Sequence, residues 1–172
     1  RGVSFTNASG FDLSPGPIAV YDGASYAGDA QIAYTSRGQE RLLAYAVDLD
    51  VAINSDQQQT HEVRRTRIVR GAFETTSLSR NATTYKINNR DAQRDRTIVI
   101  EHPKMNGWDL VAPAKAASET DAMLRFEVPV AAGDATTFEV VFERTNLSSV
   151  GVTSLPLPTL MSYVQTGKAS KA

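Results

Sequence analysis

The stretch Leu43-Ala-Tyr-Ala-Val-Asp-Leu-Asp-Val-Ala-Ile53 decides the fold class that the sequence predicts. An apolar residue stands at every second position from Leu43 to Ile53, and alanine or aspartate stands between them. Successive side chains of a strand point to opposite faces, so the larger apolar residues would share one face. A helix would scatter them around its circumference. The period therefore predicts a strand with one face on a core, in an all-β protein.

The residues before this stretch predict a three-stranded antiparallel meander. Gly16–Tyr21 is apolar at most positions, as expected of a strand buried on both faces. Asp22-Gly23 is a turn signal, and Tyr26–Tyr34 then predicts the second arm of a hairpin. Ser36–Gln39 is another turn, which leads the chain into Leu43–Ile53. Short connections favour antiparallel neighbours, so the three strands should pair in chain order.

Further strands are predicted along most of the remaining chain, where alternating or β-branched stretches are separated by turn residues. The alternation is imperfect between Arg64 and Arg70, which indicates a β-bulge or an edge strand. Two alternating stretches flank the turn sequence Ala131–Ala135, and they predict a hairpin. Residues 62–89 are predicted to form two or three strands, at about 62–70, 73–78 and 83–88. The other predicted strands outside the meander are residues 3–7, 97–102, 108–111, 124–130 and 138–142.

Together these strands predict an antiparallel β-sandwich-like domain over residues 1–147, with one or two short helices. The polar sequence Asn54–Gln59 suggests a lobe boundary near residues 55–60, and Ala114–Ala117 is predicted to form a helical turn. Residues 148–172 form a predicted C-terminal tail. It begins with a linker rich in Ser, Pro and Leu and continues into the start of a helical segment at Leu160–Gly167.

The composition excludes several classes of function. A net charge of −1 gives no overall field that would gather nucleic acid or an anionic membrane surface. No apolar run approaches the roughly 20 residues of a membrane-spanning helix, so this portion should not span a bilayer. The absence of cysteine removes thiol nucleophiles, disulfides and thiolate metal sites. Because the chain begins at Arg1 without a methionine, we expect it to be part of a longer polypeptide.

Seven motifs in a fixed order give the chain a family resemblance that covers most of residues 1–147. They are Gly16–Gly23, Tyr26–Ala30, Tyr45–Asp50, Ile100–Pro103, Trp108–Val111, Leu124–Val128 and Ala132-Gly133 with the strand after it. With these motifs the chain resembles a bacterial domain of unknown function found in mucoidy inhibitor A-like proteins. The resemblance implies a β-sandwich-like domain of an exported bacterial protein, often followed by a helical segment. The family is named for an effect on exopolysaccharide-rich colonies, and it supplies no established catalytic residues.

Asp48 and Asp50 are the first candidate site residues. On a strand they would share one face about 7 Å apart, as a Ca²⁺ pair or two acid/base carboxylates would require. The favoured alternative is a solvated strand face or an aspartate that holds a turn.

His61 and His102, each beside a glutamate, are the candidate metal ligands, and Glu101 accompanies His102. A zinc site needs three or four converging ligands, whereas adjacent strand residues point to opposite faces. Each His-Glu pair therefore offers one well-aimed ligand at most, which favours structural histidines. The sequence also contains no Gly-x-Ser-x-Gly elbow and no standard phosphate-binding loop.

Arg64, Arg65, Arg67 and Arg70 form the densest basic cluster. They are candidates for contact with an acidic polymer or a partner protein, but the favoured explanation is an edge strand protected by charge. No exposed aromatics are interleaved with them, so single-stranded nucleic acid is not an expected partner. Trp108 is either a platform for stacking on a sugar or, as we favour, a core residue.

The sequence predicts a non-catalytic binding or scaffold domain of a larger bacterial protein, without a cofactor. Its expected partner is another protein or another region of the same polypeptide. We expect export to the periplasm or cell envelope, with a cytoplasmic location as the alternative. Two other functions stay open: a carbohydrate-binding module that uses Trp108 or the tyrosines on a polysaccharide, and a metal-assisted hydrolase that uses His102 and acidic residues.

Overall fold

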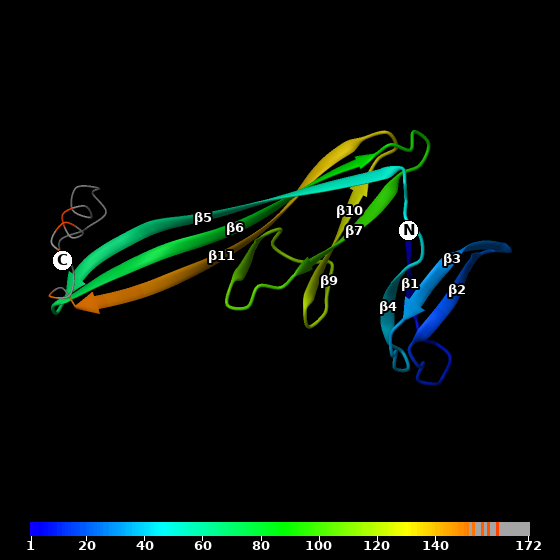
Figure 1. The fold of residues 1–172 in the computed structure, drawn as a ribbon, viewed down its shortest axis with the longest axis horizontal. Helices are drawn as coiled ribbons and strands as arrows, with labels where there is room; N and C mark the ends of the chain where they lie inside the picture. The colour runs from blue at the N-terminus through cyan, green and yellow to red at the C-terminus, as the bar shows by residue number, and fades with distance from the viewer. Residues whose placement is uncertain (152, 154–155, 157, 159–160, 162–172) are drawn as a thin grey trace. The chain divides into compact units, whose positions relative to one another are not determined.

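The computed structural model describes residues 1–151 together with residues 153, 156, 158 and 161, and the chain divides into two compact units. The first unit is Arg1–Asp50, and the second begins at Val51. From Arg1 to Gly151 the chain consists of strands and the turns and loops between them, and all strand pairs are antiparallel (Figure 1). This confirms the predicted all-β class.

The first unit contains two pairs of strands. Strand β2 (Gly16–Asp22) forms the predicted hairpin with β3 (Ser25–Ile32), and β1 (Gly2–Thr6) pairs with β4 (Glu40–Ala44). The predicted meander is therefore wrong, because β4 takes β1 as its partner. The small core of this unit is Ala30, Ile32 and Leu43, with Phe5, Leu13, Ile18, Val20 and Tyr45 packed against it. The alternating burial of β2 also shows that this strand is not buried on both faces.

The stretch Leu43–Ile53 is not a single strand, contrary to the prediction. Strand β4 ends at Ala44, the next strand begins at Val51, and Val47 and Leu49 between them are 81% and 83% exposed. A carboxylate oxygen of Asp48 accepts the backbone N–H of Asp50 at 3.2 Å. Such a local side-chain bond holds a turn and competes with extended pairing. The alternating pattern therefore spans the division between the two units.

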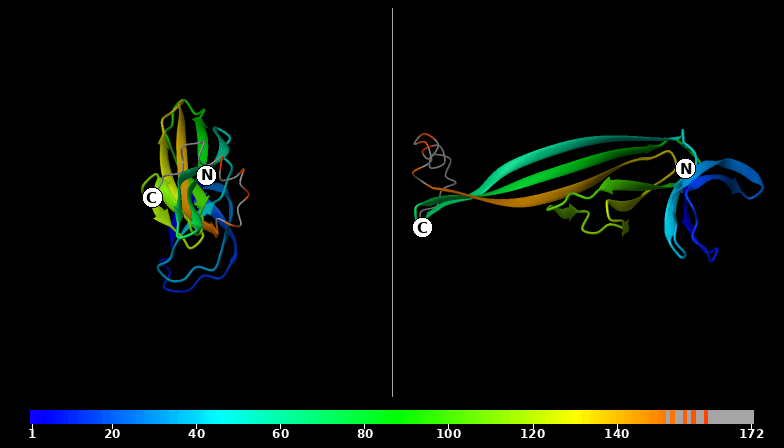
Figure 2. Two further views of the ribbon diagram at one scale, coloured as in Figure 1. Left: turned by 90° about the vertical axis from the view of Figure 1, so that its left-hand side faces the viewer. Right: turned by 60° about the horizontal axis from the view of Figure 1, so that its bottom comes forward.

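The second unit is built on a four-stranded sheet with three unusually long strands. They are β5 (Val51–Val69), β6 (Ala72–Asn89) and β11 (Ala135–Gly151), and β8 (Asp109–Ala112) completes the order β5-β6-β11-β8. Figures 1 and 2 show the three long strands side by side, continuing well past the smaller sheet of the same unit. Arg70 and Gly71 join β5 to β6 with φ angles of 50° and 79°, as a tight two-residue hairpin turn requires.

The long strands overturn several predicted boundaries. The expected lobe boundary at residues 55–60 lies inside β5. Of the two or three strands predicted over residues 62–89 there are two, because 73–78 and 83–88 belong to one continuous strand, β6. Residues 148–151 belong to β11 and are not a linker. The polar residues Asn54–Gln59 can belong to strand β5 because each of them pairs with β6 while its side chain remains exposed. No helical turn forms at residues 114–117, and the helical segment predicted at 160–167 lies outside the described residues, Met161 excepted.

A smaller sheet of order β7-β10-β9 shares a core with the long strands. It consists of β7 (Arg96–Pro103), β10 (Met123–Val130) and β9 (Ser118–Glu119). The predicted hairpin between residues 124–130 and 138–142 is wrong, because β10 pairs with β7 and β9 whereas β11 pairs with β6 and β8. The alternation identified the buried face of each strand but not its partner. The buried core residues are Ile87, Ile100, Leu124, Phe126, Val128, Val130, Val140 and Phe142.

Candidate binding surface

The register of the three long strands sorts their side chains onto two faces. Side chains directly opposite one another on neighbouring strands share a face, and the face alternates along each strand. Ser79 of β6 stands opposite His61 of β5 and Arg144 of β11, so these three residues form one row. We call the face that carries this row and the core residues Ile87 and Phe142 the core-side face, and the opposite one the outer face.

Nearly all the charge of these strands lies on the outer face. The same register places there Asp56, Glu62, Glu74, Glu139, Glu143, Arg65, Arg67, Arg80 and Lys86. Arg67 binds Glu74 at 2.6 Å, and Arg80 lies 3.7 Å from Glu143. On the core-side face of β5, β6 and β11, Arg144 is the one residue with a permanent charge, and no carboxylate accompanies it.

Beyond the core, the core-side face carries a row of small polar side chains on β6. Ser77, Ser79 and Asn81 are 8%, 7% and 7% exposed, and longer side chains of the flanking strands bond to Ser79 and Asn81. Gln57 donates to Asn81 at 3.0 Å, and the Nδ1 atom of His61 lies 3.1 Å from the Ser79 hydroxyl oxygen. The Ser79 oxygen also accepts from Asn146 at 3.4 Å. Buried polar groups are normally hydrogen-bonded, and these cross-strand bonds meet that requirement without a covering sheet.

Trp108 lies where the core ends and this polar row begins. Its indole is half-buried and packs against the core cluster, which agrees with the favoured interpretation of this residue. The guanidinium carbon of Arg144 lies 5.1 Å from the centre of the indole ring. This is the geometry of a cation–π contact, so one face of the indole is already occupied by the arginine.

His102 is a core residue of the second unit. It is 7% exposed, its ring stacks on Phe142 with centres 5.5 Å apart, and its Nδ1 atom lies 2.7 Å from the Tyr85 hydroxyl oxygen. Burial lowers the pKa of His102 and raises the pKa of Tyr85, because both charged forms are disfavoured away from water. Glu101 points to the other face of the sheet, where it accepts a bond from Arg125 at 2.8 Å. The contact between His102 and Tyr85 is therefore neutral and structural.

The remaining predicted site residues do not converge. Asp48 lies 3.6 Å from Arg1 and holds the turn at Asp50, so the two aspartates do not share a strand face. His61 and His102 bond to different hydroxyl groups. Among the described residues there is no group of three or more His, Asp or Glu side chains that would hold a metal ion.

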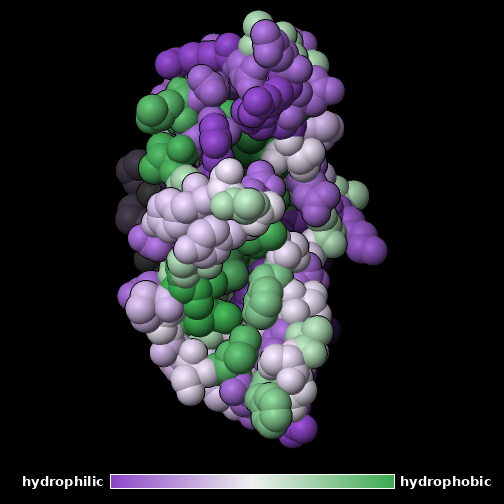
Figure 3. Space-filling view, turned by 90° about the vertical axis from the view of Figure 1, so that its right-hand side faces the viewer, coloured by the Kyte–Doolittle hydropathy of each residue, from purple (hydrophilic) through white to green (hydrophobic). Residues whose placement is uncertain are grey.

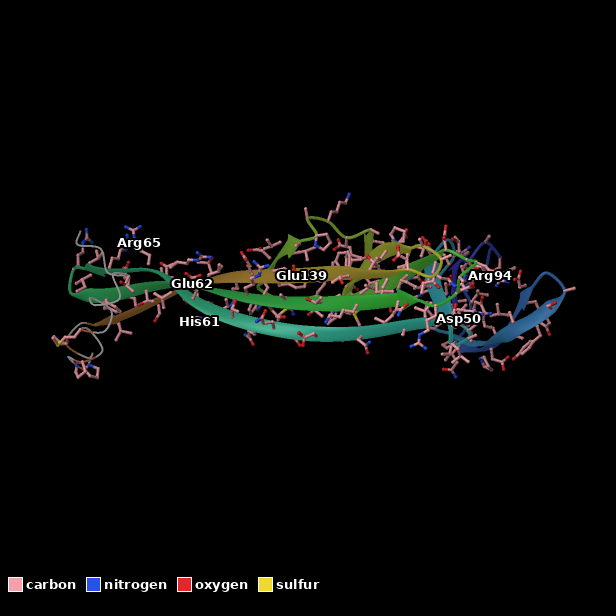
Figure 4. The ribbon with its side chains drawn as sticks, turned by 90° about the horizontal axis from the view of Figure 1, so that it is seen from above. Asp50, His61, Glu62, Arg65, Arg94 and Glu139 are labelled. Carbon is pink, nitrogen blue, oxygen red and sulfur yellow. The ribbon has the colours of Figure 1, made fainter. Side chains whose placement is uncertain are left out.

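The outer edge of β5 extends further toward the start of the strand than the sequence predicted. Strand β5 is 19 residues long and pairs with β6, and no other described strand pairs with its second edge. The irregularity predicted between Arg64 and Arg70 is confirmed, because the register shifts between Val63 and Arg65 as at a bulge. Arg64 itself contacts Glu62 at 3.5 Å. Figure 4 shows the order of His61, Glu62 and Arg65 along the strand. The absence of Gly and Pro from Asn54 to Gln59 was the available signal that this polar segment is a strand.

Apolar side chains also reach the surface. In the first unit Phe11, Val47 and Leu49 are more than two-thirds exposed, at 75%, 81% and 83%. Figure 3, which looks at one side of the molecule, shows green apolar surface interspersed with purple polar side chains. Single exposed apolar side chains among polar ones are common on protein surfaces, so these residues do not by themselves mark a binding site.

No protein-family model, curated protein or solved structure matches this chain. The resemblance to the domain of mucoidy inhibitor A-like proteins therefore stays a prediction. Within the described residues, no helix has the length and apolar character that crossing a membrane would require.

Proposed function

We propose that this chain is a non-catalytic binding or scaffold domain that engages another polypeptide along the free edge of β5. The observation that carries the proposal is the unpaired outer edge of a strand 19 residues long, within the described part of the chain. Along such an edge every second residue presents its backbone N–H and C=O groups outward. An extended segment of a partner pairs with these groups and adds a strand to the sheet.

The sequence and register of β5 support this role. From Val51 to Val63 the strand keeps an uninterrupted register with β6 and contains no proline or glycine, so its free edge is regular. The devices that normally protect an edge, a bulge and a cluster of charges, begin only at Arg64. The core shared by the long strands and the smaller sheet supports a sandwich-like base that would hold the edge rigidly. On the basis of the family resemblance, the same proposal includes that the chain is part of a larger bacterial protein and that this protein is exported.

A carbohydrate-binding role is the second candidate, and one observation favours it. Arg144 and Trp108 lie beside the hydroxyl, amide and imidazole groups of the core-side face, with no carboxylate on that face of the long strands. Such a set of donors suits the hydroxyl and carboxylate groups of an acidic sugar. A titration of the chain with a polyuronate, followed by the fluorescence of Trp108, should saturate and should be lost in Arg144→Met if this role holds. A linear response that does not saturate would contradict the carbohydrate-binding role.

Site-specific photo-crosslinking tests the leading proposal. A photoreactive amino acid at Gln58, in the regular part of β5, should give a covalent adduct with another polypeptide in cells that make the full-length protein. The matched control is the same amino acid at Glu139, which lies on the same outer face but on β11. The proposal predicts an adduct at position 58 and none at position 139. Equal yields at both positions, or no adduct at either, would contradict it.

A further inference from the structure

We infer that the partner at the edge of β5 is a second copy of this chain, paired antiparallel about a two-fold axis. The inference rests on the proposed function, since it names the partner of the same edge. It comes from the distribution of charge along β5. The one charged residue of the first half of the strand is Asp56, whereas the second half carries Arg64, Arg65 and Arg67 and a single acid, Glu62. An antiparallel copy brings each half opposite the other.

Two of these charges have no ion pair with any described residue. Asp56 and Arg65 are both exposed on the outer face. By contrast, Arg64 contacts Glu62, and Arg67 contacts Glu74. The unpaired charges are therefore one acid and one base on the same face of the same free-edged strand. That is the arrangement a self-complementary edge requires, because an isologous contact uses the same patch on both subunits.

The bulge sets the register in which these charges meet. If Thr60 faces Thr60 of the partner subunit, Asp56 lies four positions before the axis. Arg65 lies four pairing positions after it, at the end of the series 61, 62, 63 and 65, because the bulge leaves Arg64 out of the register. Asp56 then faces Arg65 of the partner subunit, and the two-fold axis repeats the contact. Without the extra residue, Arg64 would be the residue opposite Asp56.

The same register creates no clash of like charges. Glu62 faces Gln58 of the partner subunit, His61 faces Gln59, and Arg67 faces Asn54. Like charges directly opposite each other would destabilise the pairing, so their absence favours this alignment. The result is a continuous sheet in which the two β5 strands lie at the centre. Backbone hydrogen bonds supply the affinity, and the two Asp56–Arg65 contacts fix the alignment.

A charge-reversal cycle tests the inference on the chain itself. Sedimentation equilibrium at low ionic strength should show a dimer for the unaltered chain. Asp56→Arg and Arg65→Glu should each raise the dimer Kd by about tenfold or more, because each replaces two attractive contacts with two repulsive ones. The double variant D56R/R65E should return the Kd to within about threefold of the original value, since it restores the same contacts with reversed sign.

Two controls separate edge pairing from a general effect of charge. Glu139→Arg reverses a charge in the same cross-strand row as Asp56, but on β11, and Arg94→Glu reverses an exposed charge in a loop. Both should leave the Kd unchanged. Circular dichroism and Trp108 fluorescence establish that each variant is folded. A monomeric chain at all concentrations, or a double variant weaker than both single variants, would overturn the inference.

A cysteine placed on the axis gives an independent measurement. The chain has no cysteine of its own, so Thr60→Cys introduces the only thiol. Directly opposed residues of an antiparallel pair lie within disulfide range. Mild oxidation should therefore link Thr60→Cys chains into covalent dimers and leave Glu139→Cys chains unlinked. If Thr60→Cys stays unlinked while the photoreactive group at Gln58 captures a different protein, the homodimer falls and the proposed binding function stands.

Discussion

Replacing Tyr85 with phenylalanine removes one oxygen atom from the core of the second unit. The Tyr85 hydroxyl oxygen lies 2.7 Å from Nδ1 of His102, a residue that is 7% exposed. Burial lowers the pKa of His102, so at pH 7.5 the ring is neutral, and Nδ1 and the Tyr85 hydroxyl share one hydrogen bond. Without the hydroxyl, a buried ring nitrogen of His102 loses its hydrogen-bond partner, which costs about 1–3 kcal/mol. We expect Tyr85→Phe to lower the free energy of unfolding of this unit by that amount.

Urea unfolding followed by the fluorescence of Trp108 measures this change. Trp108 is the single tryptophan of the chain and packs against the same core, so its signal reports on the unit that contains Tyr85. The matched control is Thr137→Val, which deletes an exposed hydroxyl group from β11 and should change the free energy of unfolding by no more than about 0.5 kcal/mol. If Tyr85→Phe is no more destabilising than Thr137→Val, the assignment of a supporting hydrogen bond to His102 is incorrect.

Three further predictions concern pH, a buried amide and a close backbone approach. The pKa of His102 lies below the ordinary 6.5 in the folded state, so the unfolded state takes up its proton first as the pH falls. The free energy of unfolding should then be independent of this residue above about pH 6.5 and fall by at most about 1.4 kcal/mol per pH unit below it. His102→Gln should remove that component of the slope in urea titrations between pH 7.5 and 5, and an unchanged slope would assign the pH dependence to other groups. Asn89 is fully buried and donates to the carbonyl oxygens of Arg94 at 2.8 Å and Ala131 at 3.0 Å, so Asn89→Ala should cost about 2 kcal/mol or more by the Trp108 assay. The exposed neighbour offers the control Asn88→Ala, and equal effects of the two would contradict the reasoning. Gly28 has a φ of 150°, and a Cβ there would overlap the carbonyl oxygen of Tyr45, so Gly28→Ala should destabilise the first unit by about 1–3 kcal/mol. Amide hydrogen exchange in β3 measures that loss; Gly16→Ala, where a Cβ meets open space, should show none, and equal exchange in both variants would argue against a close approach at Gly28.

The sequence predicted the strands more successfully than their partners. Alternation placed Leu124, Phe126 and Val128 correctly on the buried face of β10. It gave no information on whether β10 pairs with β11 or faces it across the core, because both arrangements bury the same side chains. The residues of Leu43–Ile53 alternate as in a strand, but they do not form one continuous strand. A hydrogen bond to the Asp48 side chain stabilises a turn within this stretch.

The candidate site was predicted in parts. The irregular pattern at Arg64 correctly indicated a bulge on an edge strand, since an extra residue shifts the phase of the alternation. The sequence did not indicate that the edge extends back to Val51. The polar residues from Asn54 to Gln59 were interpreted as a break, although they stay in a strand that exposes their side chains. The row on β6 from Ser77 to Asn81 was also missed, because small polar residues carry no period that distinguishes a buried face.

The connectivity of the long sheet has a consequence for the order in which it folds. Strands β5 and β6 are joined by a two-residue turn, so their pairing closes only a short loop and should form early. Strand β11 meets β6 from far along the chain, with its nearest pair, Ala135 and Asn88, separated by 135 − 88 = 47 residues. During synthesis the β5–β6 hairpin therefore has both edges unpaired until β11 has left the ribosome. We expect delays in translation before residue 135 to favour aggregation, and synonymous codons that speed this interval to raise the yield of folded protein.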